Sequence, residues 1–180
     1  NGNSLNPTPS NWPNNPNRPV EKVSWDDAQI FLTRLNNQEA ANLPTGWEYI
    51  LPTEAQWEYA CRAGTITSFS WGNTISDSDA NWMNTNDVNQ TQNVGQYSAN
   101  PWGFFDMHGN VWEWTNDWKA SYSENNVTDP KGPDMGSEKI VRGGSYASHS
   151  PYVRSARRHA YETNATYSGI GFRLALFNIN

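Results

Sequence analysis

Cysteine is almost absent from this sequence. The 180 residues contain one, Cys61, which excludes an internal disulfide framework and any metal site built on a Cys-x-x-Cys pair. Cys61 falls on the apolar side of a helical pattern, so we expect a buried structural thiol, with a reactive nucleophile as the alternative. The cysteine count does not fix the cellular compartment.

Charge and long apolar runs are also scarce. Charged residues make up 17% of the chain, and no apolar stretch approaches the roughly 18 residues that a membrane-spanning helix needs. The net charge is −6, and the 12 basic residues form no run, although Arg154, Arg157 and Arg158 lie close together. The sequence therefore argues against a membrane span and against a nucleic-acid groove.

Tryptophan, by contrast, is abundant, with 10 residues. Frequent Asn, Ser, Thr and Gly accompany it, which predicts a loop-rich fold held by large aromatic anchors. The length suits one domain, residues 1–180. Residues 1–18 are rich in Asn and Pro, so we expect an extended arm or loop there, ordered if Trp12 anchors it.

Two helices are predicted early in the chain. The first begins after Ser24, a favoured N-cap, with two aspartates in its first turn and apolar residues at positions 28, 31, 32 and 35. The second begins after Thr53, where Gln56 completes a capping box, and Gly64 is a natural stop. Helical periodicity then disappears, and residues 139–142 and 171–176 alternate as short strands do.

Five stretches occur in a fixed order: PVEKVSWDDA (19–28), LPTEAQWEYACRAG (51–64), GFFDMHGNVWEW (103–114), RGGSY (142–146) and GFRLA (171–175). In this order they resemble the formylglycine-generating enzyme family, also called the sulfatase-modifying factor family. The resemblance covers about residues 19–176. It implies an α+β, C-type-lectin-like fold, with two early helices, a small antiparallel sheet and long ordered loops supported by calcium.

Members of this family differ in what they do, so the fold does not settle the function. Some oxidise a sulfatase cysteine to formylglycine, some are metal-dependent sulfur-transfer enzymes, and some are non-catalytic binding proteins, a few of them diversified by retroelements near the C-terminus. The resemblance places the two copper-binding cysteines of the oxidases at Ser148 and Val153. Neither side chain supplies the soft thiolate that Cu(I) requires. We therefore expect a non-catalytic member.

Other enzymatic readings find little support in the sequence. The sulfur-transfer relatives bind iron through several His residues, whereas His108, His149 and His159 show no ligand spacing. A Ser-His arrangement within residues 145–149 stays open, but no G-x-S-x-G turn is present. The alternative function is a metal-dependent oxidoreductase of the same family with an altered active site.

The stretch 103–114 concentrates carboxylates and aromatic side chains. The resemblance places a calcium site on it, with the ligands Asp106, Gly109, Val111 and Glu113. Calcium takes six to eight oxygen ligands from carboxylates and carbonyls, and carbonyls two residues apart can face one side of an extended chain. On the residues alone, a turn at 108–110 with solvated carboxylates is the alternative. A second, weaker calcium site is predicted at Asn81, Trp82 and Asp87.

Residues 147–168 have the composition of a binding surface. Tyr and Arg supply large contacts at low entropic cost, and Ser and Asn supply adaptable hydrogen bonds. The predicted contact residues are Tyr146, Ser148, His149, Tyr152, His159, Tyr161 and Tyr167. An ordinary polar surface loop is the alternative.

We therefore expect a calcium-stabilised binding or interaction module. No EPN- or QPD-like triplet is present to complete a sugar site, so a protein partner, or a place in a larger surface assembly, is favoured over a glycan. The expected location is extracellular, periplasmic or at the cell surface.

Overall fold

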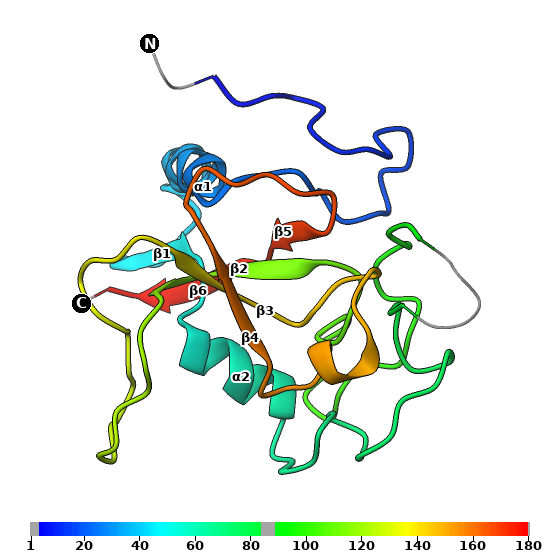
Figure 1. The fold of residues 1–180 in the computed structure, drawn as a ribbon. Helices are drawn as coiled ribbons and strands as arrows, with labels where there is room; N and C mark the ends of the chain where they lie inside the picture. The colour runs from blue at the N-terminus through cyan, green and yellow to red at the C-terminus, as the bar shows by residue number, and fades with distance from the viewer. Residues whose placement is uncertain (1–3, 84–88, 180) are drawn as a thin grey trace.

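The computed structural model describes residues 4–83 and 89–179. Figure 1 shows the arrangement of its elements. In chain order they are α1 (Trp25–Glu39), β1 (Trp47–Ile50), α2 (Glu54–Arg62), β2 (Trp112–Trp118), β3 (Lys139–Arg142), a 3-10 helix (Ser150–Tyr152), β4 (Arg158–Tyr161), β5 (Ile170–Phe172) and β6 (Ala175–Asn178). Within these residues, no helix is long and apolar enough to cross a membrane.

Both predicted helices form, and local capping fixes where each begins. The Ser24 hydroxyl accepts the Asp27 N–H, and the Asp27 carboxylate accepts the Ser24 N–H at 3.0 Å. Thr53 and Gln56 repeat this capping box at α2. The second helix ends where Ala63 turns left-handed, at φ 46°. The sequence therefore places both helix starts correctly.

The strands form two sheets. The four-stranded sheet has the order β4-β3-β2-β5, in which β2 and β5 are parallel and the other neighbours are antiparallel. The second sheet pairs β1 with β6. The stretch predicted as one strand, 171–176, is in fact divided between β5 and β6, because the chain leaves the larger sheet at Arg173 and Leu174.

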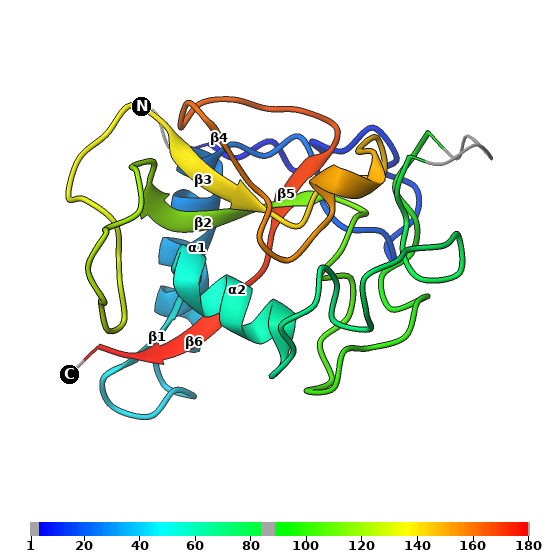
Figure 2. The ribbon, with the colours of Figure 1, turned by 60° about the horizontal axis from the view of Figure 1, so that its bottom comes forward.

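The two faces of β2 pack against different helices. In Figure 1, α1 lies above the four-stranded sheet and α2 lies below it, and Figure 2 brings α2 forward. Trp112 and Trp114 pack with the α1 residues Ala28 and Leu32. Glu113 points the other way, toward α2. Alternation along the strand thus places the two tryptophans on the face opposite Glu113.

The arm before α1 packs on the domain. Trp12 meets the ring of Tyr146 edge-on at 5.7 Å, and the Arg18 guanidinium lies 5.4 Å from the Trp12 ring. The Asn11 N–H donates to the fully buried Glu21 carboxylate at 2.6 Å. The arm is therefore anchored through Trp12, as its sequence suggested.

Candidate ligand-binding site

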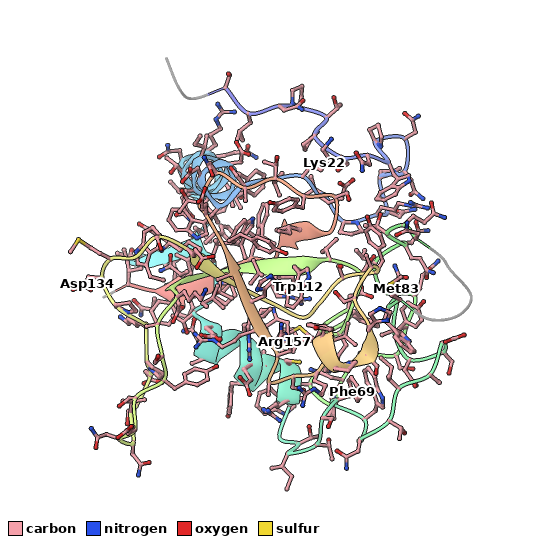
Figure 3. The ribbon with its side chains drawn as sticks, in the orientation of Figure 1. Lys22, Phe69, Met83, Trp112, Asp134 and Arg157 are labelled. Atoms are coloured by element: carbon pink, nitrogen blue, oxygen red, sulfur yellow. The ribbon has the colours of Figure 1, made fainter. Side chains whose placement is uncertain are left out.

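One cavity of about 430 Å³ is lined by all seven residues predicted to contact a ligand. They come from the turn after β3, the 3-10 helix, β4 and the segment before β5. Trp112 and Arg157 also line it, and Figure 3 labels both near the centre of the molecule. Neither was predicted as a contact. The sequence presented Trp112 only as part of the stretch 103–114 and Arg157 only as one of three neighbouring arginines.

Strand alternation and register build the cavity wall. His159 and Tyr161 lie two residues apart on β4, and the register pairs His159 with Val141. The His159 ring lies 5.9 Å from the Trp112 ring and 4.7 Å from the Tyr161 ring, and Tyr161 lies 5.1 Å from Tyr167. The result is a continuous aromatic wall, whose rings can stack on flat groups or pack against apolar ones.

The cavity has a fixed floor and an accessible rim. Trp112 and Tyr146 are only 6% and 7% exposed, whereas Tyr152 and Tyr167 are 44% and 55% exposed. The Tyr146 hydroxyl lies 2.9 Å from the Ser168 hydroxyl, which ties the floor to the segment before β5. Exposed aromatics around a buried floor are the usual form of a binding hot spot.

Ser148 and Val153, which the resemblance matches to the cysteines of the oxidases, lie in the turn after β3 and directly after the 3-10 helix. Gly144 has φ +76°, and a Cβ there would lie 2.5 Å from Val153 Cγ1, so only glycine fits. The Ser145 N–H donates to the Ser148 hydroxyl at 3.0 Å. Ser148 is buried and Val153 is completely buried. Neither a hydroxyl nor an isopropyl group supplies the thiolate that Cu(I) requires, so the expectation drawn from the resemblance stays a prediction.

Cys61 is buried, as predicted, and lies beside His108. Its sulfur is 3.5 Å from His108 Nε2. His108 Nδ1 lies 2.7 Å from the Val153 carbonyl, which can only accept, so Nδ1 carries the proton and Nε2 accepts from the Ser70 N–H. Burial lowers the pKa of His108 to about 4 and raises the pKa of Cys61 to about 12. At neutral pH the pair is a thiol and a neutral imidazole, which is a packing contact.

The three histidines do not converge. His108 is in the interior near α2, whereas His149 and His159 line the cavity. Across residues 4–83 and 89–179, no three or more His, Cys, Asp or Glu side chains gather closely enough to hold a metal ion through those groups alone. Calcium sites built partly from carbonyls are outside that criterion.

The predicted calcium loop contains an ion pair that joins distant parts of the chain. Arg173 donates through Nε and Nη2 to the two Glu113 oxygens at 2.5 and 2.6 Å. The Trp57 indole N–H donates to the same carboxylate at 2.6 Å. Glu113 and Arg173 also line a second cavity together with Asp106 and Val111. Arg173 belongs to the stretch GFRLA, but nothing in the sequence identified Glu113 as its partner.

The oxygens that remain free decide whether this loop fits calcium. Asp106 accepts the Gly95 N–H through Oδ2 at 2.7 Å, and Oδ1 bonds to no described residue. Burial raises the pKa of the Asp106 carboxyl, which Arg173 opposes. Glu113 Oε1 keeps one lone pair beyond its bond to Arg173. Asp106, Val111 and Glu113 thus line one cavity, whereas Gly109 does not line it and Arg173 competes as a cation, so the predicted calcium site stays a prediction.

The weaker calcium site is less clear in the structure. The Asn81 amide donates to the Gln90 carbonyl at 3.0 Å and to the Asn110 side chain at 3.2 Å. The Trp82 indole donates to the Ser76 carbonyl. Asp87 lies outside the described residues. The Asn81 side chain thus connects two loops by hydrogen bonds, and the second calcium site stays a prediction.

The comparisons with known proteins agree with the motifs and the fold. The family described as "Sulfatase-modifying factor enzyme 1-like domain" matches residues 2–177. The chain belongs to this family. It is 33% identical to the formylglycine-generating enzyme of Mus musculus over 176 residues, which are 88% of this chain and 44% of that protein. Against the Streptomyces coelicolor enzyme, identity is 33% over 179 residues, with 89% and 53% covered.

The solved structures show the same fold. Treponema denticola variable protein 1 superposes with a TM-score of 0.81 at 26% identity, covering 93% of this chain and 76% of that one. PvdO from Pseudomonas aeruginosa gives 0.74 at 26% identity, covering 90% and 63%. The chain spans about half the length of the curated enzymes that it matches. Membership of the sulfatase-modifying factor family is therefore established on sequence and on fold.

Proposed function

We propose that this domain is a non-catalytic binding module whose ligand, part of a protein partner, occupies the cavity between the turn after β3 and β4. The observation that carries the proposal is the convergence of seven Tyr, His and Ser side chains on that one cavity. Accessible aromatics on a fixed floor supply contact area at low entropic cost. The resemblance in fold to a protein named a variable protein is consistent with a binding role.

The chemistry of the neighbouring positions supports the same proposal. Oxidation of a sulfatase cysteine by relatives of this chain relies on a cysteine pair, and Ser148 and Val153 stand at the matching positions. Cys61 lies in the interior and is protonated at neutral pH. A buried thiol that does not ionise is neither a nucleophile nor a ready metal ligand. These residues favour binding over turnover.

A calcium ion in the loop 106–113 is the second part of the proposal. Asp106 Oδ1, Glu113 Oε1 and the carbonyls of Gly109 and Val111 would hold it. Its contribution would be structural, because it would join the loop before β2 to the strand itself. We further propose that the module acts outside the cytoplasm, where free calcium is plentiful enough to fill such a site.

The binding proposal can be tested by presenting the domain on beads to the surface and secreted proteins of its native host. A Tyr152→Ser, Tyr167→Ser double variant removes two accessible rings of the cavity. Tyr59→Ser is the matched control, because Tyr59 is 70% exposed and does not line this cavity. We expect a partner that the wild type and the control retain and that the double variant loses.

Two results would contradict the proposal. One is retention of every partner by the double variant. The other is stoichiometric copper or iron in the purified protein, measured by metal mass spectrometry, together with conversion of the cysteine in a sulfatase peptide. That second result would favour the oxidoreductase alternative.

A further inference from the structure

Arg157 stands apart from the other arginines of the domain. Among the described residues, no hydrogen bond joins its guanidinium to an acceptor, although a buried Nε without a partner is something it shares with Arg18 and Arg142. Arg142, Arg158 and Arg173 instead hold Glu carboxylates. A guanidinium carries five N–H donors, so an arginine whose guanidinium has no internal acceptor keeps donors for an acceptor from outside.

The position of Arg157 directs it into the ligand cavity. The residue precedes β4 and lines the cavity wall, where Figure 3 labels it. Its guanidinium lies 4.5 Å from the ring centroid of Tyr152. Stacking on a ring fixes the plane of the guanidinium and leaves its N–H edge free for a second interaction. Arg157 is therefore oriented before any ligand arrives.

The rest of the lining contains donors and rings but no opposite charge. Of the described residues that line the cavity, none is Asp or Glu. Burial and the nearby Arg157 lower the pKa of His159, with Lys119 acting in the same direction and Glu138 opposing them. His159 is therefore neutral at pH 7, and Arg157 is the fixed charge of the cavity. An anion would be attracted here without competition from a resident carboxylate.

The fixed charge of Arg157 favours an anionic ligand over a neutral sugar in this cavity. Sugar hydroxyls need acceptors as well as donors, and carboxylates are the strongest acceptors that a protein offers. A carboxylate flanked by apolar or aromatic groups matches both the cation and the wall of rings. An acidic residue in a protein segment presents that combination.

We propose that Arg157 binds the carboxylate of an Asp or Glu side chain on the protein partner, while neighbouring groups of the same segment pack on Tyr152, Tyr161 and Tyr167. The planar guanidinium can hold a carboxylate through two parallel hydrogen bonds. This inference rests on the proposed binding function and adds the chemistry of the ligand.

The test uses two short peptides that differ in charge alone, acetyl-Tyr-Glu-Tyr-amide and acetyl-Tyr-Gln-Tyr-amide. Each is titrated into ¹⁵N-labelled protein, and the Arg157 Nε–Hε resonance is followed by NMR, assigned by its loss in Arg157→Gln. We expect the Glu peptide to bind with a Kd on the order of 1 mM. The Gln peptide should bind at least about fivefold more weakly, because the charge-assisted hydrogen bonds are lost.

Variants separate this inference from the proposed function. Arg157→Gln should abolish the preference for the Glu peptide, as read from the resonances of the cavity tyrosines, while thermal unfolding confirms that it folds. Arg154→Gln is the matched control, since Arg154 is exposed and bonds to the Pro151 carbonyl. It should keep the preference. Tyr167→Ser should weaken both peptides equally, which tests the cavity rather than the charge.

Several outcomes would overturn the inference. Equal affinity for the two peptides, or no shift with either at about 20 mM, would exclude a carboxylate site but would leave the bead experiment to decide the binding function. If Arg154→Gln also lost the preference for the Glu peptide, general surface charge would explain that preference. Binding of free glucuronate as tightly as the Glu peptide would point to an acidic glycan in place of a protein partner.

Discussion

Replacing Glu113 with Gln should destabilise the domain whether or not calcium is present. The Glu113 and Arg173 side chains are 7% and 25% exposed, and both carboxylate oxygens are bonded to Arg173. The substitution leaves a largely buried guanidinium without its counter-charge, and breaking such a pair costs about 3 to 5 kcal/mol. Gln keeps one acceptor oxygen, so we expect the lower end, about 3 kcal/mol.

The assay is thermal unfolding followed by circular dichroism, in EDTA and in calcium. A loss of about 3 kcal/mol corresponds to a fall in Tm of roughly 6 to 12 °C for a domain of this size. Glu138→Gln is the matched control. It breaks the Lys119–Glu138 pair, whose side chains are 55% and 33% exposed, and should change stability by less than about 1 kcal/mol. A Glu113→Gln variant as stable as the wild type in EDTA would refute the reasoning.

The same experiment separates calcium from the ion pair. Because Glu113 serves both, a loss in Glu113→Gln alone does not demonstrate calcium binding. Asp106→Asn does, since Asp106 has no bond to Arg173 among the described residues and offers its free oxygen to the ion. Calcium at 100 times its Kd should stabilise the wild type by about 2.7 kcal/mol. We expect Asp106→Asn to reduce this gain and to leave the Tm in EDTA nearly unchanged.

Three further predictions concern the interior. Gly109→Ala should cost more than about 3 kcal/mol in denaturant unfolding, because φ is +81° and a Cβ would lie 2.1 Å from the Asn81 carbonyl oxygen. His108 has a pKa of about 4 when folded, against 6.5 for an unperturbed imidazole, so stability should fall as pH decreases from 6.5 to 4. Over this pH range, the free energy of unfolding of the wild type should fall by about 3 kcal/mol more than that of His108→Asn. Cys61 should react with DTNB only as fast as the protein unfolds.

Local sequence signals were sufficient for the helices but not for all strands. Ser24 and Thr53 begin their helices through side-chain bonds three residues away, so the sequence alone contains the signal. β1, β2 and β4 were not predicted, because the residues of β1 and β2 show no regular alternation of burial and those of β4 are largely polar. All three become strands by pairing with segments distant in sequence. Such pairing has no signature within a short window.

The residues of the candidate site also divide into those that the sequence identified and those that only the structure shows. Residue type and position in the chain pointed to the tyrosines and histidines of 146–167, and all of them line one cavity. Arg157 was not selected, because an arginine without a partner is recognised only once every possible acceptor has been placed. The Glu113–Arg173 pair joins residues 60 positions apart, beyond any local pattern. Each of the two residues lies in a stretch shared with the family, but these stretches do not show that the two side chains bond to each other.

The segment that carries the cavity is held from below by residues that do not line it. Arg142 donates to the carbonyls of Ser155 and Ala156, and the Ser155 N–H donates to the Ser68 carbonyl. Arg158, on the opposite side of β4 from His159, binds the Glu54 carboxylate at 2.6 and 2.8 Å. The backbone of this segment therefore depends on buried contacts, while the side chains at the rim are free to differ.

This separation predicts that the exposed side chains of the rim can be replaced with little loss of stability. His149, Tyr152, His159 and Tyr167 are exposed, and surface substitutions usually change stability by less than about 0.5 kcal/mol each. Replacing all four with Ser should therefore cost less than about 2 kcal/mol, measured by urea unfolding. Glu54→Gln should cost more, because it removes the counter-charge of Arg158 and one of the two carboxylates that face Arg142. A quadruple variant that fails to fold would show that these rings hold the structure together, and their convergence would then no longer favour a binding surface.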